Sequence, residues 1–475
     1  MNIKKEWAIL FIVLPMTFMT TLDSSIVNVA LPTMAKELKT SMAGIEWVVT
    51  SYLIVICATI LLFGKLGDII GKSQIFKIGI GIFTFGSLLC GFSNTLFMLI
   101  VSRIIQAIGA GAAMATNQGI ITETFSANER GRALGMIGTA VALGTMIGPT
   151  LGGLIVSIAP WKYIFLINIP IGVLVYFGVI KILPFKEKES DFDFDIKGSI
   201  LFMITVALLF IAINFGQTLG YNNLFIVIAF ITSLVLFVIF IKTEAKSENP
   251  MLNIKIFKNK LFSLSIFCGF TSFVSIGAVN IILPFYYQDV LSLSPSSAGL
   301  MMTVSPIILA IVAPVSGHLS DKIGSEKISA LGLSILSVGI FFLIIFNVDT
   351  SLIIVGILVG LLSLGSGVFQ SPNNSLIMST VEKNQLGIAG SINGLVRNLG
   401  TTTGIALSTS ILYSRMSSKL GYKVSGYIEG RADAFIYAMR FVFLGIGSIC
   451  LIGAILSIIR VIKRERGLKK NKAYV

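Results

Sequence analysis

The stretch GKLGDIIGK (64–72) separates two long apolar segments, and its spacing returns in GHLSDKIGS (317–325). Two glycines, an aspartate and the intervals between them are kept, 253 residues apart. VNVALP (27–32) likewise returns as VNIILP (279–284), 252 residues later, and Gly131, Gly138, Gly144 and Gly148 return after 256 residues. One match in a glycine-rich apolar chain means little, but several ordered matches at nearly one offset indicate a duplicated unit.

The composition is that of a membrane protein. The chain has 475 residues, of which 55% are hydrophobic and only 12% charged, with a mean hydropathy of +0.92; a soluble domain carries about 25% charged residues. A helix needs about 20 apolar residues to cross a bilayer, and lipid excludes open sheet. We therefore predict an all-α polytopic protein with fourteen spanning helices, near 8–30, 45–64, 75–93, 96–116, 132–158, 163–183, 198–216, 223–241, 261–285, 298–316, 328–346, 350–372, 387–412 and 435–459.

The net charge of +14 does not indicate a nucleic-acid partner, because of how the charge is distributed. Most of the 36 Lys and Arg residues fall in alternate connecting segments and at the two ends of the chain. The positive-inside rule assigns these segments and both termini to the cytoplasm. We expect a multi-pass protein of the cell membrane, surrounded by lipid, and the Lys and Ile bias suggests a bacterial source.

The repeat divides the chain into three parts. Both copies of the polar stretch lie on the same side of the membrane, which indicates parallel repeats related by an axis along the membrane normal. We expect an N-terminal six-helix bundle over 1–190, two inserted transmembrane helices over 191–255, and a C-terminal six-helix bundle with a cytoplasmic tail over 256–475.

Nothing in the sequence points to enzymatic or metal chemistry. The four cysteines, at 57, 90, 268 and 450, lie in separate apolar segments, and His318 is the single histidine. The sequence contains no metal-ligand spacing, no nucleophile–base pairing and no pair of deep carboxylates. We predict a protein that is not an enzyme and uses neither a metal nor a cofactor.

Several motifs together resemble the major facilitator superfamily and, within it, the fourteen-helix drug:proton antiporters. GKLGDIIGK resembles the superfamily motif between the second and third helices, although Ile69 and Ser73 stand where the family usually has basic residues. The resemblance covers nearly the whole chain and implies the major facilitator fold with alternating access. Four more stretches are similar to family signatures: LDSSIVNVALP (22–32), WVVTSYL (47–53), RIIQAIGAG (103–111) and WKYIFLINIPIG (161–172).

The repeated polar stretch is a candidate latch, which we predict to be a loop in both copies. Asp68 could accept backbone N–H groups of a neighbouring helix, because a helix N-terminus favours negative charge. A solvated polar turn is the alternative, and the two missing basic residues predict a weaker latch than the family pattern implies. The motif residues are Gly64, Asp68, Gly71 and Lys72 in the first copy and Gly317, Asp321 and Gly324 in the second.

The fifth predicted helix carries the antiporter motif of the family in full. Its residues are Gly135, Gly144, Gly148, Pro149, Gly152 and Gly153. Three of these glycines are four residues apart and share one face, where small residues let two helices approach closely, while the proline favours a kink. Packing against a neighbouring helix explains the spacing, and the resemblance adds a sealed, bendable contact between the two halves.

Three charged side chains lie well inside predicted helices: Asp23, Arg103 and Arg397. Insertion scales put the cost of such a charge at about 2.5–3.5 kcal/mol, so each is a functional hypothesis. Ser275 and Val359 occupy the repeat positions of Asp23 and Arg103, so the scaffold does not require the charges. We predict that Asp23 carries the coupling proton; a structural bond to Arg103 or to another polar group is the alternative. The resemblance gives Arg103 a part in proton coupling, and we assign Arg397 a structural or gating role.

An amphipathic cargo would need aromatic faces and dipoles around its cavity. The candidate cavity residues are Asn28, Trp47, Tyr52, Phe273, Asn280 and Tyr286. Packing, or a position at the membrane interface, explains each of them more simply. The predicted C-terminal spans contain no acid in their interiors, which favours neutral or monovalent cargo over dications.

We therefore predict a monomeric exporter of small amphipathic, cationic or neutral compounds, driven by the proton gradient. A lipid flippase or a metabolite symporter of the same fold is the alternative, since an amphipathic cavity suits either. A non-transporting receptor is disfavoured, because its output would need a soluble domain and the connecting segments here are short.

Overall fold

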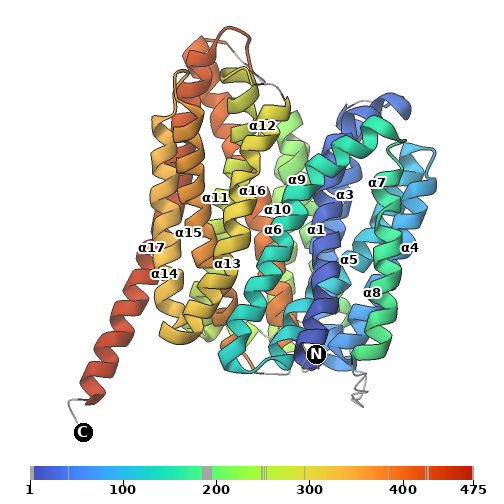
Figure 1. The fold of residues 1–475 in the computed structure, drawn as a ribbon, viewed down its shortest axis with the longest axis vertical. Helices are drawn as coiled ribbons and strands as arrows, with labels where there is room; N and C mark the ends of the chain where they lie inside the picture. Colours follow the sequence, from blue (N-terminus) through green and yellow to red (C-terminus); the bar gives the residue numbers. More distant parts are fainter. Residues whose placement is uncertain are drawn as a thin grey trace. The chain divides into compact units, whose positions relative to one another are not determined.

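A computed structural model of the protein describes residues 5–40, 42–45, 47–183, 195–247, 250, 252, 254–293, 295–382, 385–422, 424 and 427–472. All regular structure in these residues is helical (Figure 1). The first part of the chain forms α1 (Lys5–Glu37), α2 (Met42–Ile45), α3 (Trp47–Ile70), α4 (Lys72–Phe92), α5 (Leu96–Thr124), α6 (Ala127–Ile158), α7 (Tyr163–Leu166) and α8 (Asn168–Ile182).

The remaining helices follow in the second part of the chain. Two of them are α9 (Ile196–Leu219) and α10 (Leu224–Lys246). After them come η1 (Ile254–Lys258), α11 (Lys260–Phe285), the π-helical turn η2 (Tyr286–Val290), α12 (Pro295–Met302), α13 (Val304–Ile323), α14 (Ser325–Phe342), η3 (Leu343–Ile345), α15 (Leu352–Ser379), α16 (Leu386–Leu420) and α17 (Ala432–Lys472).

Each of the fourteen predicted segments is helical, but only twelve helices of the described chain are long and apolar enough to cross a membrane. The other two are α9 and α16. In α9 the described apolar run covers only Lys197–Ile213. Helix α16 is long enough to cross a membrane, but it is rich in Gly, Ser, Thr and Asn and contains Arg397. It is therefore less apolar than the twelve helices above.

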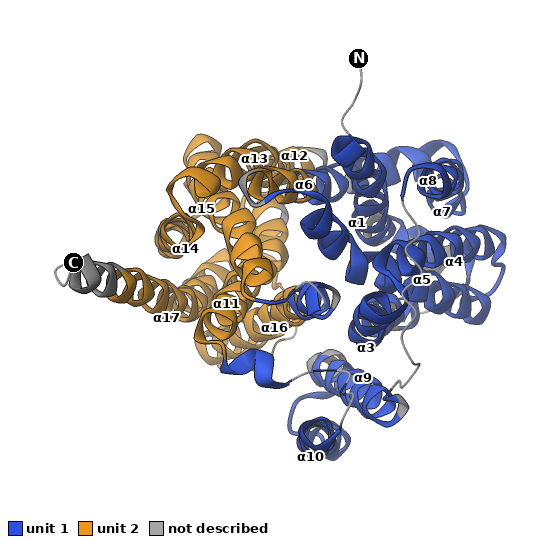
Figure 2. Cartoon of the chain, turned by 90° about the horizontal axis from the view of Figure 1, so that it is seen from below, with its two compact units in different colours: residues 1–126, 139–258, 381–395 blue, residues 127–138, 259–380, 396–475 orange. Residues whose placement is uncertain are grey.

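The chain forms two compact units, which are coloured separately in Figure 2. Unit 1 contains residues 1–126, 139–258 and 381–395; unit 2 contains 127–138, 259–380 and 396–475. Helices α6 and α16 are therefore each divided, with the first part of each helix assigned to one unit and the rest to the other. The boundaries near 190 and 255 that the repeat suggests remain a prediction.

A close helix pair recurs in the two units. In unit 1, α4 packs along α5, and in unit 2, α14 packs along α15. An added Cβ at Gly86 would lie 2.5 Å from Gln106 Cα, and one at the repeat position Gly339 would lie 2.9 Å from Leu362 Cα, the repeat position of Gln106. Glycine at these positions lets the two helix backbones touch, so the duplication in sequence is also a duplication in packing.

Helices α9 and α10 form a hairpin that belongs to unit 1 (Figure 2). They pack on each other, with the Phe202 and Phe240 rings 5.4 Å apart, and α9 also contacts α3. The ring of Trp47 on α3 lies 5.1 Å from that of Phe215 on α9. Trp47 therefore fixes the hairpin to the bundle.

The prediction of a loop at 64–72 and at 317–325 is wrong for most of both stretches. Helix α3 continues through Asp68 to Ile70, and α13 continues through Asp321 to Ile323. Each turn is a single glycine, Gly71 with φ 104° and Gly324 with φ 99°. Glycine adopts this conformation without strain, so one residue is enough to redirect the chain. Gly64, Asp68, Gly317 and Asp321 are therefore helical residues.

The α4–α5 contact predicts a sharp intolerance at Gly109, where an added Cβ would overlap the backbone nitrogen of Phe83. We expect Gly109→Ala to destabilise the protein by about 1–3 kcal/mol, because an overpacked interface must shift. Gly81→Ala on α4 is the matched control, since its added Cβ would lie 3.6 Å from the Tyr176 ring. Thermal unfolding in detergent measures both, and equal melting temperatures for the two variants would refute the packing argument.

Candidate functional site

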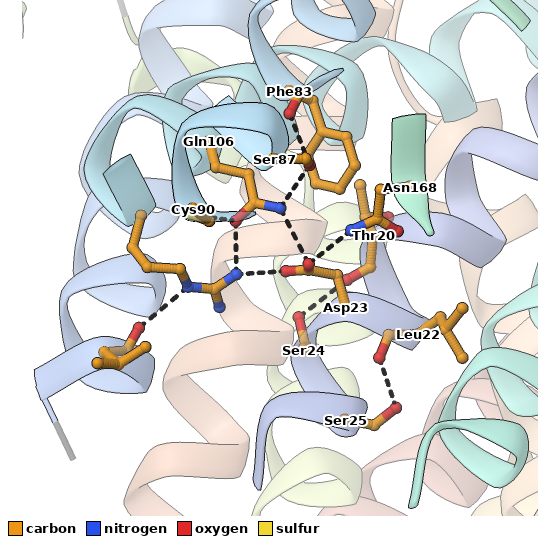
Figure 3. Close-up of polar contacts among 12 residues, drawn as sticks. Thr20, Leu22, Asp23, Ser24, Ser25, Phe83, Ser87, Cys90, Gln106 and Asn168 are labelled. Atoms are coloured by element: carbon orange, nitrogen blue, oxygen red, sulfur yellow. Dashed lines mark hydrogen bonds and ion pairs between the residues drawn. The ribbon is translucent and has the colours of Figure 1, made fainter. Parts of the chain in front are cut away.

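A polar network surrounds Asp23 in the interior of unit 1 (Figure 3). Arg103 Nη1 donates to Asp23 Oδ2 at 2.5 Å. Gln106 Nε2 and Asn168 Nδ2 both donate to Asp23 Oδ1, at 2.9 Å and 2.8 Å. Ser87 Oγ in turn accepts from Gln106 Nε2 at 2.8 Å. Side chains from α1, α5 and α8 therefore meet at one carboxylate, and Ser87 on α4 is connected to it through Gln106.

The Arg103 guanidinium is held on several sides. Its Nη1 donates to Gln106 Oε1 at 2.6 Å, and its Nε donates to the Val48 carbonyl at 3.1 Å. The guanidinium carbon lies 3.9 Å from the centre of the Tyr52 ring and 5.5 Å from that of Phe165. Aromatic faces attract a cation, most strongly where water is excluded. Arg103 thereby links α5 to α3 and α7 as well as to Asp23.

The Asp23–Arg103 pair is completely enclosed, since both side chains are 0% exposed. Removing two charges from water is costly, and only good geometry with further hydrogen bonds offsets that cost. Three N–H donors on Asp23 supply those bonds. Of the three nitrogens of the Arg103 guanidinium, only Nη2 lacks an acceptor among the described residues. The ion pair between Asp23 and Arg103, which the sequence offered as the alternative role of Asp23, is present in this structure. A role of Asp23 in proton coupling stays a prediction.

The described residues of the second repeat contain no such network. Ser275 stands in place of Asp23 and donates to the Thr271 carbonyl at 2.9 Å. The repeat positions of Ser87, Arg103 and Gln106 are Ile340, Val359 and Leu362, and all three side chains belong to the apolar core of unit 2. The polar network is therefore an addition to one copy of a shared scaffold.

A second set of charges lies at the α3–α4 turn. Lys72 Nζ is 2.7 Å from Asp68 Oδ1 and 2.9 Å from Glu123 Oε1. Asp68 Oδ2 accepts the backbone N–H of Ile388, in the first turn of α16, at 3.1 Å. This residue belongs to the part of α16 that is assigned to unit 1. Asp68 thus caps a helix N-terminus, where negative charge is favoured.

The repeat reproduces this capping in unit 2. Asp321 near the end of α13 accepts the backbone N–H groups of Gly131 and Arg132, near the start of α6. Ser371 on α15 donates to the Gly131 carbonyl at 3.2 Å. Each of the two capping aspartates therefore holds the first turns of a helix that is divided between the units.

The glycines of the antiporter motif contact two different helices. An added Cβ at Gly144, Gly148 or Gly152 would meet α1, at Thr21, Ser25 and Ile26 respectively. Ser25 Oγ also donates to the Gly144 carbonyl at 3.0 Å. These three share one face, and the face packs on α1 inside unit 1. Gly135 instead faces α13, where its Cβ would lie 2.8 Å from Pro314 Cα. Gly153 is half-buried, and the side chain of Pro149 lies outside the described atoms.

The structure brings one of the predicted cavity residues, Tyr52, to the Asp23 network. Trp47 is half-buried against Phe215, and Tyr286 is buried, stacked on Phe346 with its hydroxyl donating to the Asn347 carbonyl at 2.8 Å. Phe273 is half-buried against Gly400, Asn280 is exposed and Arg397 is half-buried on α16, whereas the side chain of Asn28 is outside the described atoms.

Two hydrogen-bond donors to the Asp23 carboxylate were not identified from the sequence. Gln106 was noticed only as part of the RIIQAIGAG motif, and Asn168 only as part of WKYIFLINIPIG. Both are amides within apolar helices, and buried polar groups need partners. Ranking uncharged polar residues in spans together with the charged ones would have found them.

The network predicts that removing one charge is worse than removing both. Arg103→Gln leaves a buried carboxylate without its cation, which we expect to destabilise the protein by about 3–5 kcal/mol. Adding Asp23→Asn should restore part of that loss, because no unpaired charge then remains. Thermal unfolding of the single and double variants measures the effect, and a double variant as unstable as the sum of the singles would contradict it.

The α3–α4 turn predicts unequal roles for the two acids beside Lys72. Asp68→Asn removes a buried ion pair and a charged acceptor for the Ile388 N–H, which we expect to cost about 1.5–3 kcal/mol. Glu123→Gln is the control; the Glu123 side chain is 44% exposed, and exposed pairs contribute about 0–1 kcal/mol. Equal shifts of melting temperature for the two variants would contradict the capping role.

Comparison with known proteins places the chain in a family. The family model described as Major Facilitator Superfamily matches residues 13–405 and 265–474. The riboflavin transporter RibZ of Clostridioides difficile (strain 630) is 38% identical over 467 residues, which are 98% of this chain and 100% of that protein. The multidrug resistance protein Stp of Mycobacterium tuberculosis (strain CDC 1551 / Oshkosh) is 32% identical over 406 residues, 85% of this chain and 75% of that protein.

A solved structure shares the fold. The human organic anion transporter MFSD10 aligns with a TM-score of 0.69 at 14% identity, over 96% of this chain and 100% of that one. At this identity the likeness concerns the fold alone. With twelve apolar helices in its described residues and transporters as relatives, the chain is a multi-pass membrane protein. It belongs to the Major Facilitator Superfamily and is a transporter.

Proposed function

We propose that this transporter is a proton-coupled exporter of small amphipathic compounds, cationic or neutral, in a bacterial cell membrane. It would work as a monomer without a cofactor, with both termini in the cytoplasm and fourteen spanning helices that include α9 and α16. Asp23 would be the residue that binds the coupling proton, with Arg103 as the cation that competes for it.

One observation carries this proposal: the ionisable network occupies only one of two equivalent sites. Asp23, Arg103 and Gln106 are replaced by Ser275, Val359 and Leu362 in the repeat, and the fold of that copy is complete without them. A feature that the scaffold does not need, and that insertion into a membrane penalises, is best explained by function. Proton coupling is the function that a single buried carboxylate can serve.

The contacts suggest how the coupling could work. A proton on Asp23 would remove the negative charge that binds Arg103 Nη1 to Oδ2, so protonation weakens this ion pair. Gln106 binds both partners, so its amide could keep either one satisfied while they separate. In one state of the cycle, the ionised carboxylate would pair with Arg103 or with a cationic substrate. In the other state, the protonated carboxyl would have lost its attraction for a cation, and the substrate would leave.

The driving force is adequate for export. Moving one elementary charge across 100 mV is worth about 2.3 kcal/mol, and about 1.4 kcal/mol corresponds to a tenfold concentration ratio. One net proton per cycle could thus maintain a substrate gradient of more than tenfold. The two aspartate caps, Asp68 on α16 and Asp321 on α6, are suited to hold one conformation of the cycle while they remain intact.

A second candidate function is transport of riboflavin or a similar planar metabolite. The relative named as a riboflavin transporter matches along its whole length. A planar aromatic compound with a polar side chain is also amphipathic, so the same kind of cavity could serve. This candidate differs from the first in its cargo.

Transport by purified protein in liposomes tests the coupling. We expect Asp23→Asn to reduce transport driven by a pH gradient at least about tenfold, a loss of roughly 1.4 kcal/mol of coupling, because the variant cannot bind the proton. The matched control is Ser275→Ala, the repeat position, which should keep wild-type rates. Full gradient-driven transport by Asp23→Asn would refute the proposal.

The same liposomes separate the two cargoes. A lipophilic cationic dye and riboflavin are each offered at both signs of the pH gradient. Movement of the dye against a proton flux supports the drug exporter, whereas movement of riboflavin alone supports the second candidate. Counterflow exchange without a gradient provides the check on folding, since Asp23→Asn should still exchange substrate.

A further inference from the structure

The inserted hairpin contains two acids that neither the repeat nor the proposed transport cycle uses. Asp195 is the N-cap of α9, and its Oδ1 accepts the N–H of Gly198 at 2.8 Å. Glu244 lies in the last turns of α10, and its Oε2 accepts the N–H of Leu252 at 2.8 Å. One oxygen of each carboxyl group thus accepts a hydrogen bond from a backbone N–H.

The other two oxygens converge. An added Cβ at Gly198 would collide with Glu244 Oε1 and lie 2.8 Å from Asp195 Oδ2, and the two side chains are in hydrogen-bonding contact. Both oxygens are buried, and neither has a donor among the described residues. Glu244 is only 2% exposed. Two facing carboxylate oxygens without a donor repel each other, so a hydrogen-bonding contact between them requires a proton.

The surrounding charges do not remove this requirement. Lys65 on α3 attracts Glu244 electrostatically, but among the described residues it donates no hydrogen bond to Glu244 Oε1 or Asp195 Oδ2. Lys197, Lys242 and Lys246 line an open cavity of about 460 Å³ beside Asp195. These three lysines are exposed, so their ammonium groups are solvated.

We propose that Asp195 and Glu244 share one proton at neutral pH, with the proton on Glu244 and the charge on Asp195. The helix ends assign the two roles. Asp195 is at a helix N-terminus, which stabilises a negative charge, whereas Glu244 is at a helix C-terminus, which destabilises one. Two carboxyl groups in contact commonly divide the roles of acid and base in this way.

The shared proton would join three pieces of unit 1. It connects the start of α9 to the end of α10, and through the Leu252 N–H it fixes the segment that leads into η1 and α11. Loss of the proton would place two negative charges over Gly198 and loosen this junction. The site is separate from Asp23, and the inference stands whether or not the protein couples transport to protons.

Infrared spectroscopy of the purified full-length protein at neutral pH tests the proposal. An unperturbed carboxyl group is ionised there, so the C=O stretch of a protonated acid identifies the site. We expect this band in the difference spectrum of wild type minus Glu244→Gln, because the glutamine amide can donate to Asp195 without a proton. Asp349→Asn, which removes an exposed carboxylate, is the control and should give no such band.

A flat difference spectrum for Glu244→Gln with a wild-type elution profile would overturn the proposal. Labelling glutamate with ¹³C at the side-chain carboxyl of the wild-type protein provides a test that needs no variant. The band should shift on labelling, and a band that stays in place would place the proton elsewhere and also refute the assignment.

Discussion

The hydrogen-bonded ion pair between Arg103 and Asp23 is the interaction on which the interior of unit 1 depends. A membrane protein gains little by burying charge, because each ion loses its water and the surrounding lipid offers nothing in return. Here the cost is offset by the amides of Gln106 on α5 and Asn168 on α8 and by the face of Tyr52. The result is a junction where five helices are joined through polar contacts in the middle of an apolar bundle.

Around this junction the fold is built by simpler means. Glycines at equivalent positions bring α4 to α5 and α14 to α15, and single glycines with positive φ make the turns at 71 and 324. Aspartates at equivalent positions cap the starts of α16 and α6. These devices occur twice because the scaffold was duplicated. Among the described residues the polar network occurs once and the hairpin of α9 and α10 has no counterpart, so function is best sought in the features that break the repeat.

Much of the helix arrangement could be predicted from the sequence, because apolar runs of about 20 residues have few alternatives in lipid. The deep charges were also visible, since Asp23 and Arg103 stand out in apolar surroundings. The side chains that hydrogen-bond to these charges could not be identified from the sequence. Asn168 is 145 residues from Asp23, and only packing brings it within 2.8 Å. Similarly, the turns at Gly71 and Gly324 are shorter than hydropathy suggests, because a glycine with positive φ needs no loop. The contact between Asp195 and Glu244 depends on how one hairpin closes, which composition does not encode.

The central claim is that Asp23 exchanges a proton during transport, and proton release on substrate binding measures it most directly. Purified protein in a weakly buffered detergent solution is mixed with a cationic substrate while a pH-sensitive dye reports the protons released. We expect the wild type to release protons when the substrate binds, and Asp23→Asn to bind the substrate without releasing any. An unchanged release from Asp23→Asn would contradict it.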